Sequence, residues 1–370
     1  MRAVVPLAVL ALVACQGTAT SVNRNSPTPS LSSQASASRS ADTPPAANPA
    51  RSTSSPAAIP NPGITVTSAG KSLACRLPVT WDVQLDAYTY VHRAGFLSFP
   101  TGSLSEVRTA PNTTAFYDRA FSKWLPVWRG EVSPDGRRYA YTDGNPMLGD
   151  TRGKVHVVDV ASGVDRVLYT GAPVFWVVDF AAEGIYLSES HGDVPTTGLW
   201  LENPAGGTPR LISSSIYSPV IAGPDAYGLT FNSADPHPAP GGKVGPFNQL
   251  TRLDLVTGAS TSLFYRPGAT LQPLGADQGG DLIVEVLTDW AAPTEWWLIT
   301  PAATTRKLAT FPATSSPGGL DAVDSHGVWY AGGGPPPDGP YFVWLYTRGS
   351  FSIVASAKAF SFGVAGGCIP

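Results

Sequence analysis

The sequence predicts an all-β protein, on three observations. Turn signals recur along the chain between short runs of β-branched and aromatic residues. Several of these runs, such as residues 155–160, 282–287 and 341–346, carry apolar residues on both alternating faces, as strands covered on both faces do. The chain is also rich in glycine (38) and proline (36), while aromatic residues keep a 10% share. Frequent turns in a folded domain explain this composition better than disorder does.

Residues 128–171 contain the clearest unit of this pattern. Two turns, Ser133-Pro134-Asp135-Gly136 and Ala161-Ser162-Gly163, separate runs that predict four short strands. This pattern resembles the repeat of TolB-type β-propellers. In that repeat a turn of the first kind precedes an aromatic strand, and a turn of the second kind follows a valine-rich strand. The resemblance implies that this unit is one blade of a propeller.

Both turns recur along the chain. The second kind appears six times, within residues 99–107, 159–164, 202–212, 254–264, 300–309 and 346–354. The first kind appears five times, at residues 135–136, 183–184, 224–225, 277–280 and 324–327. We therefore expect six four-stranded blades over residues 73–370. A closed ring would place the sixth turn of the first kind where the two chain ends meet, with residues 76–81 pairing with residues 360–364.

The cysteines fit that closure. Of the three in the chain, Cys75 and Cys368 lie at the two ends of the expected ring. An even pair in an exported protein suggests a disulfide, which would fasten the ring where its ends meet. Two free thiols are the alternative.

The N-terminus resembles a bacterial lipoprotein signal. One positive charge precedes an apolar run that ends in Leu12-Val13-Ala14-Cys15, and this matches the lipobox. The resemblance implies a signal peptide over residues 1–14 and acylation of Cys15, whereas an ordinary secretory signal is the alternative. Residues 15–72 are rich in Ser, Thr, Ala and Pro, and this composition predicts a disordered tether. We expect a monomer anchored by lipid to the membrane, on the extracytoplasmic side of the cell envelope.

Composition and motifs exclude some functions. A net charge of −3 gives no general attraction to nucleic acid. No nucleophile elbow or phosphate-binding loop is visible, and the five histidines lie in no pattern of base, nucleophile and orienting acid. We expect no cofactor and no resident metal, because the pairs His191 with Asp193 and Asp235 with His237 lack the spacing of a metal signature.

The longest expected loops join the second strand of a blade to the third. They cover residues 142–154, 189–198, 232–248, 288–295 and 332–340, and residues 110–124 should reach the same face. Long loops are often functional, so the candidate binding face consists of Trp124, Asp143, Asp150, His191, Asp193, Asp235, His237 and Trp290. In contrast, we expect the tryptophans inside strand runs to pack between blades: Trp176, Trp200, Trp297, Trp329 and Trp344.

Three functions are compatible with the sequence. The favoured one is a non-enzymatic propeller that binds a protein, a glycan or a small ligand on its loop face. A hydrolase or lyase acting on envelope polysaccharide or peptide would need acidic or histidine side chains that converge in the channel. A TolB-like partner in an envelope complex is the third, although the tether stands where TolB has an amino-terminal α/β domain.

Overall fold

The computed structural model describes residues 61–86, 89–112, 114–191, 195–232, 247–289, 292–312, 317–333 and 340–370. These residues form antiparallel strands and three single-turn 3-10 helices, η1 (Gly70–Ser72), η2 (Arg129–Glu131) and η3 (Pro146–Leu148). The all-β prediction is confirmed. No helix among the described residues is long and apolar enough to cross a lipid bilayer.

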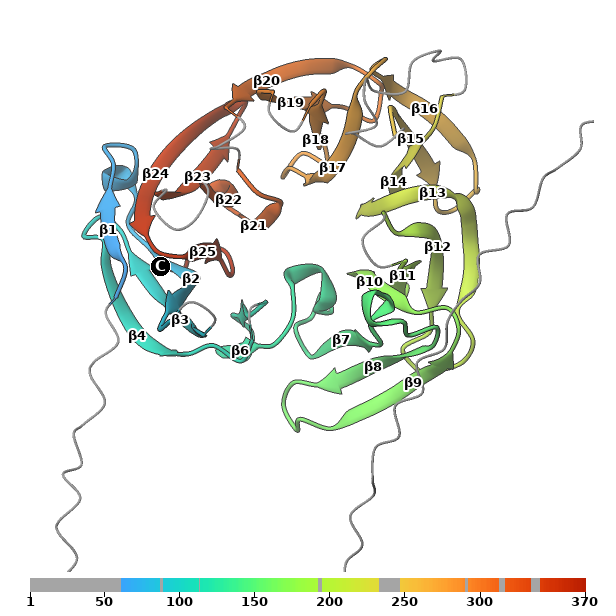
Figure 1. The fold of residues 1–370 in the computed structure, drawn as a ribbon, viewed down its shortest axis with the longest axis horizontal. Helices are drawn as coiled ribbons and strands as arrows, with labels where there is room; N and C mark the ends of the chain where they lie inside the picture. Colours follow the sequence, from blue (N-terminus) through green and yellow to red (C-terminus); the bar gives the residue numbers. More distant parts are fainter. Residues whose placement is uncertain are drawn as a thin grey trace, which may run out of the picture. The chain divides into compact units, whose positions relative to one another are not determined.

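The sheets follow one another in chain order around a common centre, as Figure 1 shows. The first contains, in spatial order, β25 (Ser361–Val364), β2 (Arg76–Gln84), β3 (Tyr90–Ser98) and β4 (Ser103–Thr109). A hairpin of β5 (Phe116–Asp118) and β6 (Lys123–Leu125) comes next. It leads to a sheet of β7 (Arg138–Asp143), β8 (Gly153–Asp159) and β9 (Asp165–Gly171), whose inner edge is extended by a bridge from Val132 to Tyr139.

The middle of the chain forms a seven-stranded sheet. Its strands are β10 (Phe175–Phe180), β11 (Ile185–Glu189), β12 (Thr197–Glu202), β13 (Arg210–Ala222), β14 (Asp225–Thr230), β15 (Gln249–Asp254) and β16 (Ser260–Tyr265). The long strand β13 pairs with β12 through its first half and with β14 through its second half. The register shifts in the second pairing after Tyr217, next to Ser218, whose φ of 44° is left-handed. One continuous strand thus belongs to two sets of four strands.

Two further sheets complete the series. One contains β17 (Thr270–Ala276), β18 (Leu282–Leu287), β19 (Thr294–Ile299) and β20 (Thr305–Phe311). The other contains β21 (Leu320–Asp324), β22 (Gly327–Gly333), β23 (Tyr341–Thr347) and β24 (Ser350–Lys358), with β1 (Gly63–Val66) added at its outer edge. The five predicted long loops are the connections of β7 to β8, β11 to β12, β14 to β15, β18 to β19 and β22 to β23.

The two ends of the described chain meet at the first sheet. Strand β25 pairs antiparallel with β2, from Val79 opposite Val364 to Asp82 opposite Ser361. The predicted disulfide between Cys75 and Cys368 is present, with the two Cα atoms 5.7 Å apart. Because disulfides persist in oxidising compartments, the bond favours an extracytoplasmic location.

Strand β1 lies before residue 73, within the segment that we expected to be tether. Ile64 and Val66 lie in β1, which pairs with β24, and both side chains pack against the hydrophobic cluster around the disulfide. The Ser- and Thr-rich composition of the region concealed this short apolar alternation. Residues 1–60, including Cys15, lie outside the described residues.

The buried core lies between neighbouring sheets, as the strands with apolar residues on both faces predicted. Trp329 is fully buried, and Trp200, Trp297 and Trp344 are partly buried against core clusters. The prediction for Trp176 was wrong, because its side chain is 51% exposed. Its neighbours Phe175 and Val177 occupy the core, and alternation along β10 therefore directs Trp176 away from it.

Candidate functional site

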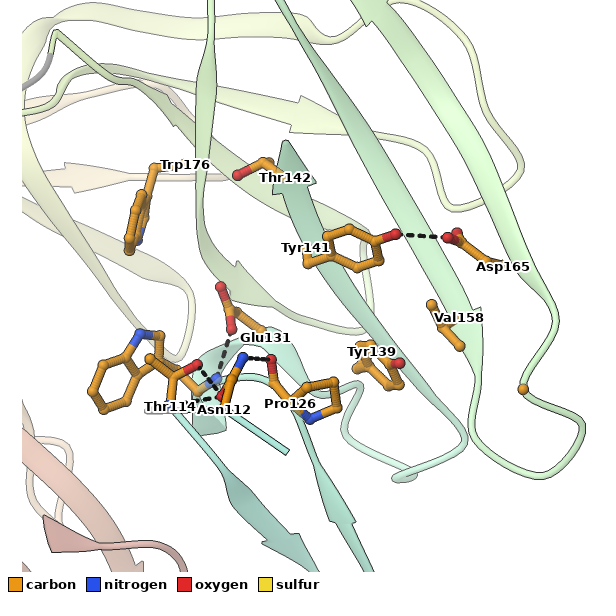
Figure 2. Close-up of a pocket in the computed structure, with 12 residues that line it drawn as sticks. Asn112, Thr114, Pro126, Glu131, Tyr139, Tyr141, Thr142, Val158, Asp165 and Trp176 are labelled. Carbon is orange, nitrogen blue, oxygen red and sulfur yellow. Dashed lines mark hydrogen bonds between the residues drawn. The ribbon is translucent and has the colours of Figure 1, made fainter. Parts of the chain in front are cut away.

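A cavity with a volume of about 480 Å³ lies beside the β7-β8-β9 sheet. We call it the aromatic cleft (Figure 2). It reaches from Thr142 near the end of β7 to Gly163 in the turn between β8 and β9. Its lining residues are Asn112, Thr114, Pro126, Trp128, Glu131, Tyr139, Tyr141, Thr142, Val158, Gly163, Asp165 and Trp176.

Four aromatic side chains come from three segments of the chain. Tyr139 and Tyr141 alternate along β7, so both project from the same face of the sheet. Trp128 precedes η2 and is 50% exposed, and Trp176, at the start of β10, is 51% exposed. Two half-exposed tryptophans in one cavity leave a large apolar area in contact with water, which is unfavourable unless a ligand covers it.

Glu131 is the carboxylate at the inner side of the cleft. It ends η2, and its Oε2 accepts a hydrogen bond of 2.6 Å from the backbone N–H of Trp128. This bond closes the turn that carries Trp128, so the carboxylate and the indole are positioned together. Burial raises the pKa of Glu131 to about 7, although the hydrogen bond acts in the opposite direction.

A hydrogen-bonded group lies at the outer side of the cleft. Tyr141 donates its hydroxyl proton to Asp165 across 2.6 Å, and its ring stacks on that of His156 with centroids 4.4 Å apart. The Nδ1 atom of His156 lies 3.1 Å from Asp165. Burial and the bond to Asp165 raise the pKa of Tyr141. Burial alone would raise the pKa of Asp165, but the bonds with Tyr141 and His156 outweigh it and lower that pKa.

The entrance side of the cleft is polar and internally bonded. Asn112 donates its side-chain N–H to the carbonyl of Pro126 across 2.9 Å. Its Oδ1 accepts bonds from the backbone N–H and the hydroxyl of Thr114, at 2.8 and 2.9 Å. These bonds fix the amide in place. The cleft therefore combines apolar walls with a few oriented polar groups, the usual composition of a small-molecule site.

A smaller cavity of about 170 Å³ lies near the centre of the sheets, and its lining includes Arg129 and Asp321. Burial raises the pKa of Asp321 to about 8, against hydrogen bonds from the backbone N–H groups of Ala331 and Val364. Burial also raises the pKa of Asp179, on β10, to about 6, against the opposing charge of Arg129. In the described parts of the chain, no three His, Cys, Asp or Glu side chains group in a way that could hold a metal ion.

The four predicted binding-face residues that the structure describes lie outside the lining of the aromatic cleft. Trp124 is in β6 rather than an exposed loop, and its ring packs 5.3 Å from that of Tyr117. Asp143 ends β7 and pairs with Lys154 at 3.1 Å. Asp150 accepts the backbone N–H of Asn145 at 2.7 Å, and His191 hydrogen bonds with the hydroxyl of Thr197 at 2.7 Å. The other four, Asp193, Asp235, His237 and Trp290, lie outside the described residues.

Sequence reasoning missed the residues that the cleft brings together. Trp128 and Glu131 lie at the start of residues 128–171, where the repeat is clearest. The repeat predicted the turn that follows them, but it gave no role to their side chains. A usable signal was the segment Trp128-Arg129-Gly130-Glu131, which places an aromatic and an acidic residue immediately before an inner strand position. Trp176 carried a second signal, because alternation along the strand places it on the opposite face from its apolar neighbours Phe175 and Val177.

Comparison with known proteins gives similarity in fold. No family model and no curated protein matches the chain. Among solved structures, TolB from Acinetobacter baumannii is 13% identical over 77% of this chain and 65% of its own, with a TM-score of 0.48. A structure from a study of two prolyl endopeptidases is 14% identical over 81% of this chain and 43% of its own, with a TM-score of 0.46. This chain thus spans less than two thirds of the length of either protein.

A third structure, a putative TolB from Agrobacterium tumefaciens, is 10% identical over 79% of this chain and 93% of its own, with a TM-score of 0.44.

Proposed function

We propose that this protein is a non-enzymatic, lipid-anchored extracytoplasmic β-propeller that binds a small ligand in the aromatic cleft. The single observation that carries the binding role is the pair of half-exposed tryptophans, Trp128 and Trp176, in one cavity of about 480 Å³. That volume suits a small molecule or a short glycan. The site contains none of the predicted loop residues that the structure describes, but it extends to the end of β7 from which the loop to β8 leaves.

The proposed propeller has six four-stranded blades and is closed at the first sheet. Two observations support this. The six turns of the second kind lie between β3 and β4, β8 and β9, β12 and β13, β15 and β16, β19 and β20, and β23 and β24. If β13 is counted in two blades, and the bridge at Val132 as an inner strand, six sets of four strands result, with the β5-β6 hairpin and the edge strand β1 as additions. The pairing of β25 with β2 then joins the last part of the chain to the first blade.

The proposed lipid anchor rests on Leu12-Val13-Ala14-Cys15 and on the oxidising environment that the disulfide requires. It is tested with Cys15→Ser in the full chain. The native protein should sediment with membranes and carry a mass increase from acyl chains, while the variant should be recovered without either. Equal membrane recovery and equal mass for both proteins would remove the anchor from the proposal.

Ligand binding is tested on the full chain purified in a non-ionic detergent. Small molecules from envelope extracts that stay bound through gel filtration are identified by native mass spectrometry. We expect a ligand on the wild type and on Leu148→Ala, a control whose side chain is 83% exposed outside the cleft. We expect none on Trp176→Ala. Equal ligand occupancy in all three proteins would rule out the cleft as the site.

A second candidate, an envelope hydrolase or lyase, is favoured by the raised pKa values of Glu131 and Asp179, about 7 and about 6. Carboxyl groups that titrate near neutral pH suit general acid and base catalysis. The test incubates envelope polysaccharide and peptide with the wild type and with Glu131→Gln. Products formed by the wild type alone would favour the enzyme, and their absence from both reactions would favour the binding protein.

A further inference from the structure

The charged side chains that line the aromatic cleft are all acidic. Its lining includes two carboxylates, Glu131 and Asp165, and no lysine or arginine. Arg129 lines the neighbouring smaller cavity instead, where it interacts with the charge of Asp179. Nearby basic side chains have other contacts. Lys154 pairs with Asp143 at 3.1 Å, Lys123 donates to the carbonyl of Val160 at 2.7 Å, and the Arg138 guanidinium lies 5.4 Å from the centre of the Phe180 ring. An anionic ligand would therefore find no cationic partner among the lining residues.

The aromatic side chains of the cleft also favour a positively charged ligand. Indole and phenol rings carry negative potential on their faces, and tryptophan attracts cations most strongly. The half-exposed rings of Trp128 and Trp176 line a cavity that also contains Tyr139 and Tyr141. Figure 2 shows Trp176, Tyr141 and Glu131 around the same open space. A cation bound there would contact ring faces and carboxylate together.

Both carboxylates are held in place before any ligand arrives. The backbone of Trp128 donates to Glu131, and the hydroxyl of Tyr141 donates to Asp165. These bonds orient the two carboxyl groups. No basic side chain in the lining balances their negative charge. The raised pKa of Glu131, about 7, is consistent with a buried carboxyl in this position. Bound positive charge would stabilise its ionised form.

We propose that the aromatic cleft selects a small organic ammonium ion, whose apolar substituents contact the two tryptophans and whose charge is balanced by Glu131. This inference rests on the proposed function, since it names the class of ligand for the same site. A methylated ammonium fits best, because its charge is spread over an apolar surface that is weakly hydrated and can leave water at low cost.

The test compares choline with 3,3-dimethyl-1-butanol, which has the same shape and a carbon in place of the charged nitrogen. Binding to the full chain in non-ionic detergent is measured by titration calorimetry. We expect choline to bind at least about tenfold more tightly than the alcohol. Glu131→Gln should weaken choline by about tenfold and leave the alcohol unchanged, and Trp176→Ala should weaken both. Leu148→Ala should behave as the wild type does.

The outcomes separate this inference from the proposed function. Equal affinities for choline and the alcohol, both reduced in Trp176→Ala, would overturn selection for a cation and keep the cleft as a ligand site. Choline binding that survives both Glu131→Gln and Trp176→Ala would also overturn it. If neither probe binds, the inference fails, and the proposed function still stands or falls on the ligand retained from envelope extracts. Unchanged melting temperatures show that each variant is folded.

Discussion

The first sheet has two neighbours, and they cover it very differently. Towards the β21-β24 sheet, residues of β2, β3 and β25 join one large cluster that includes Leu77, Trp81 and Trp329 and surrounds the disulfide. Towards β7, the cover is the short β5-β6 hairpin, with a small cluster built on Ala94, Ala110 and Ala115. The aromatic cleft opens beyond this hairpin. One side of the sheet is thus tightly packed, and the other leaves room for a ligand.

The largest expected effect is a difference in stability between variants of two tryptophans, one on the tightly packed side and one in the cleft. Trp329 is fully buried and donates its indole N–H to Asp324 across 2.8 Å, so Trp329→Ala should lower the free energy of unfolding by about 4 kcal/mol. Trp176→Ala, at a half-exposed position, should change it by less than about 0.5 kcal/mol. Urea unfolding followed by circular dichroism measures both. Similar losses in the two variants would erase the distinction between the two sides.

The disulfide should contribute somewhat less. Replacing Cys75 and Cys368 together by alanine removes a link across 293 residues and should lower the free energy of unfolding by about 3 kcal/mol. The core packing and the β25-β2 pairing remain in the variant. A reducing agent supplies the control, because it should destabilise the wild type and leave the double variant unaffected. Equal unfolding midpoints for oxidised wild type and variant would show that packing alone holds the two ends.

A further expected effect is a pH dependence of stability that comes from Asp321. Asp321 has a raised pKa of about 8, so the folded protein keeps its proton while the unfolded chain has released it. Its contribution to stability is complete below about pH 4 and is lost as the pH rises towards 8. Asp321→Asn keeps an acceptor for the Ala331 N–H, which now lies 2.8 Å from the carboxylate. This variant should flatten the fall of stability between pH 5 and about 8, and an unchanged slope would contradict the assignment.

Local turn chemistry explains why so much of the fold was predictable. Turns such as Ala161-Ser162-Gly163 impose a reversal wherever they occur, so they fixed where most strands end. The pairing at Cys75 and Cys368 followed from their places at the two ends of the repeats. Strand β1 and the β5-β6 hairpin were not predicted, because their strands are only three or four residues long and have no counterpart in the other repeats.

The cleft was less predictable because packing between distant segments creates it. Glu131 and Asp165 are 34 positions apart, and nothing in their local sequence places them around one cavity. Exposure of Trp176 likewise depends on which side of β10 meets the β7-β8-β9 sheet. Long loops were a reasonable guide to function, but they pointed to residues such as Asp150 and His191, whose described bonds are made within their own loops or to the adjacent strand.

The length of β13 affects how the molecule can deform. Since its 13 residues take part in two sets of strands, those sets cannot open separately without breaking a continuous backbone ladder. Amide hydrogens from β10 to β16 should consequently exchange as one cooperative block. Breathing motions of the domain are then concentrated at junctions without a shared strand, and the junction spanned by the β5-β6 hairpin, next to the cleft, is one of them.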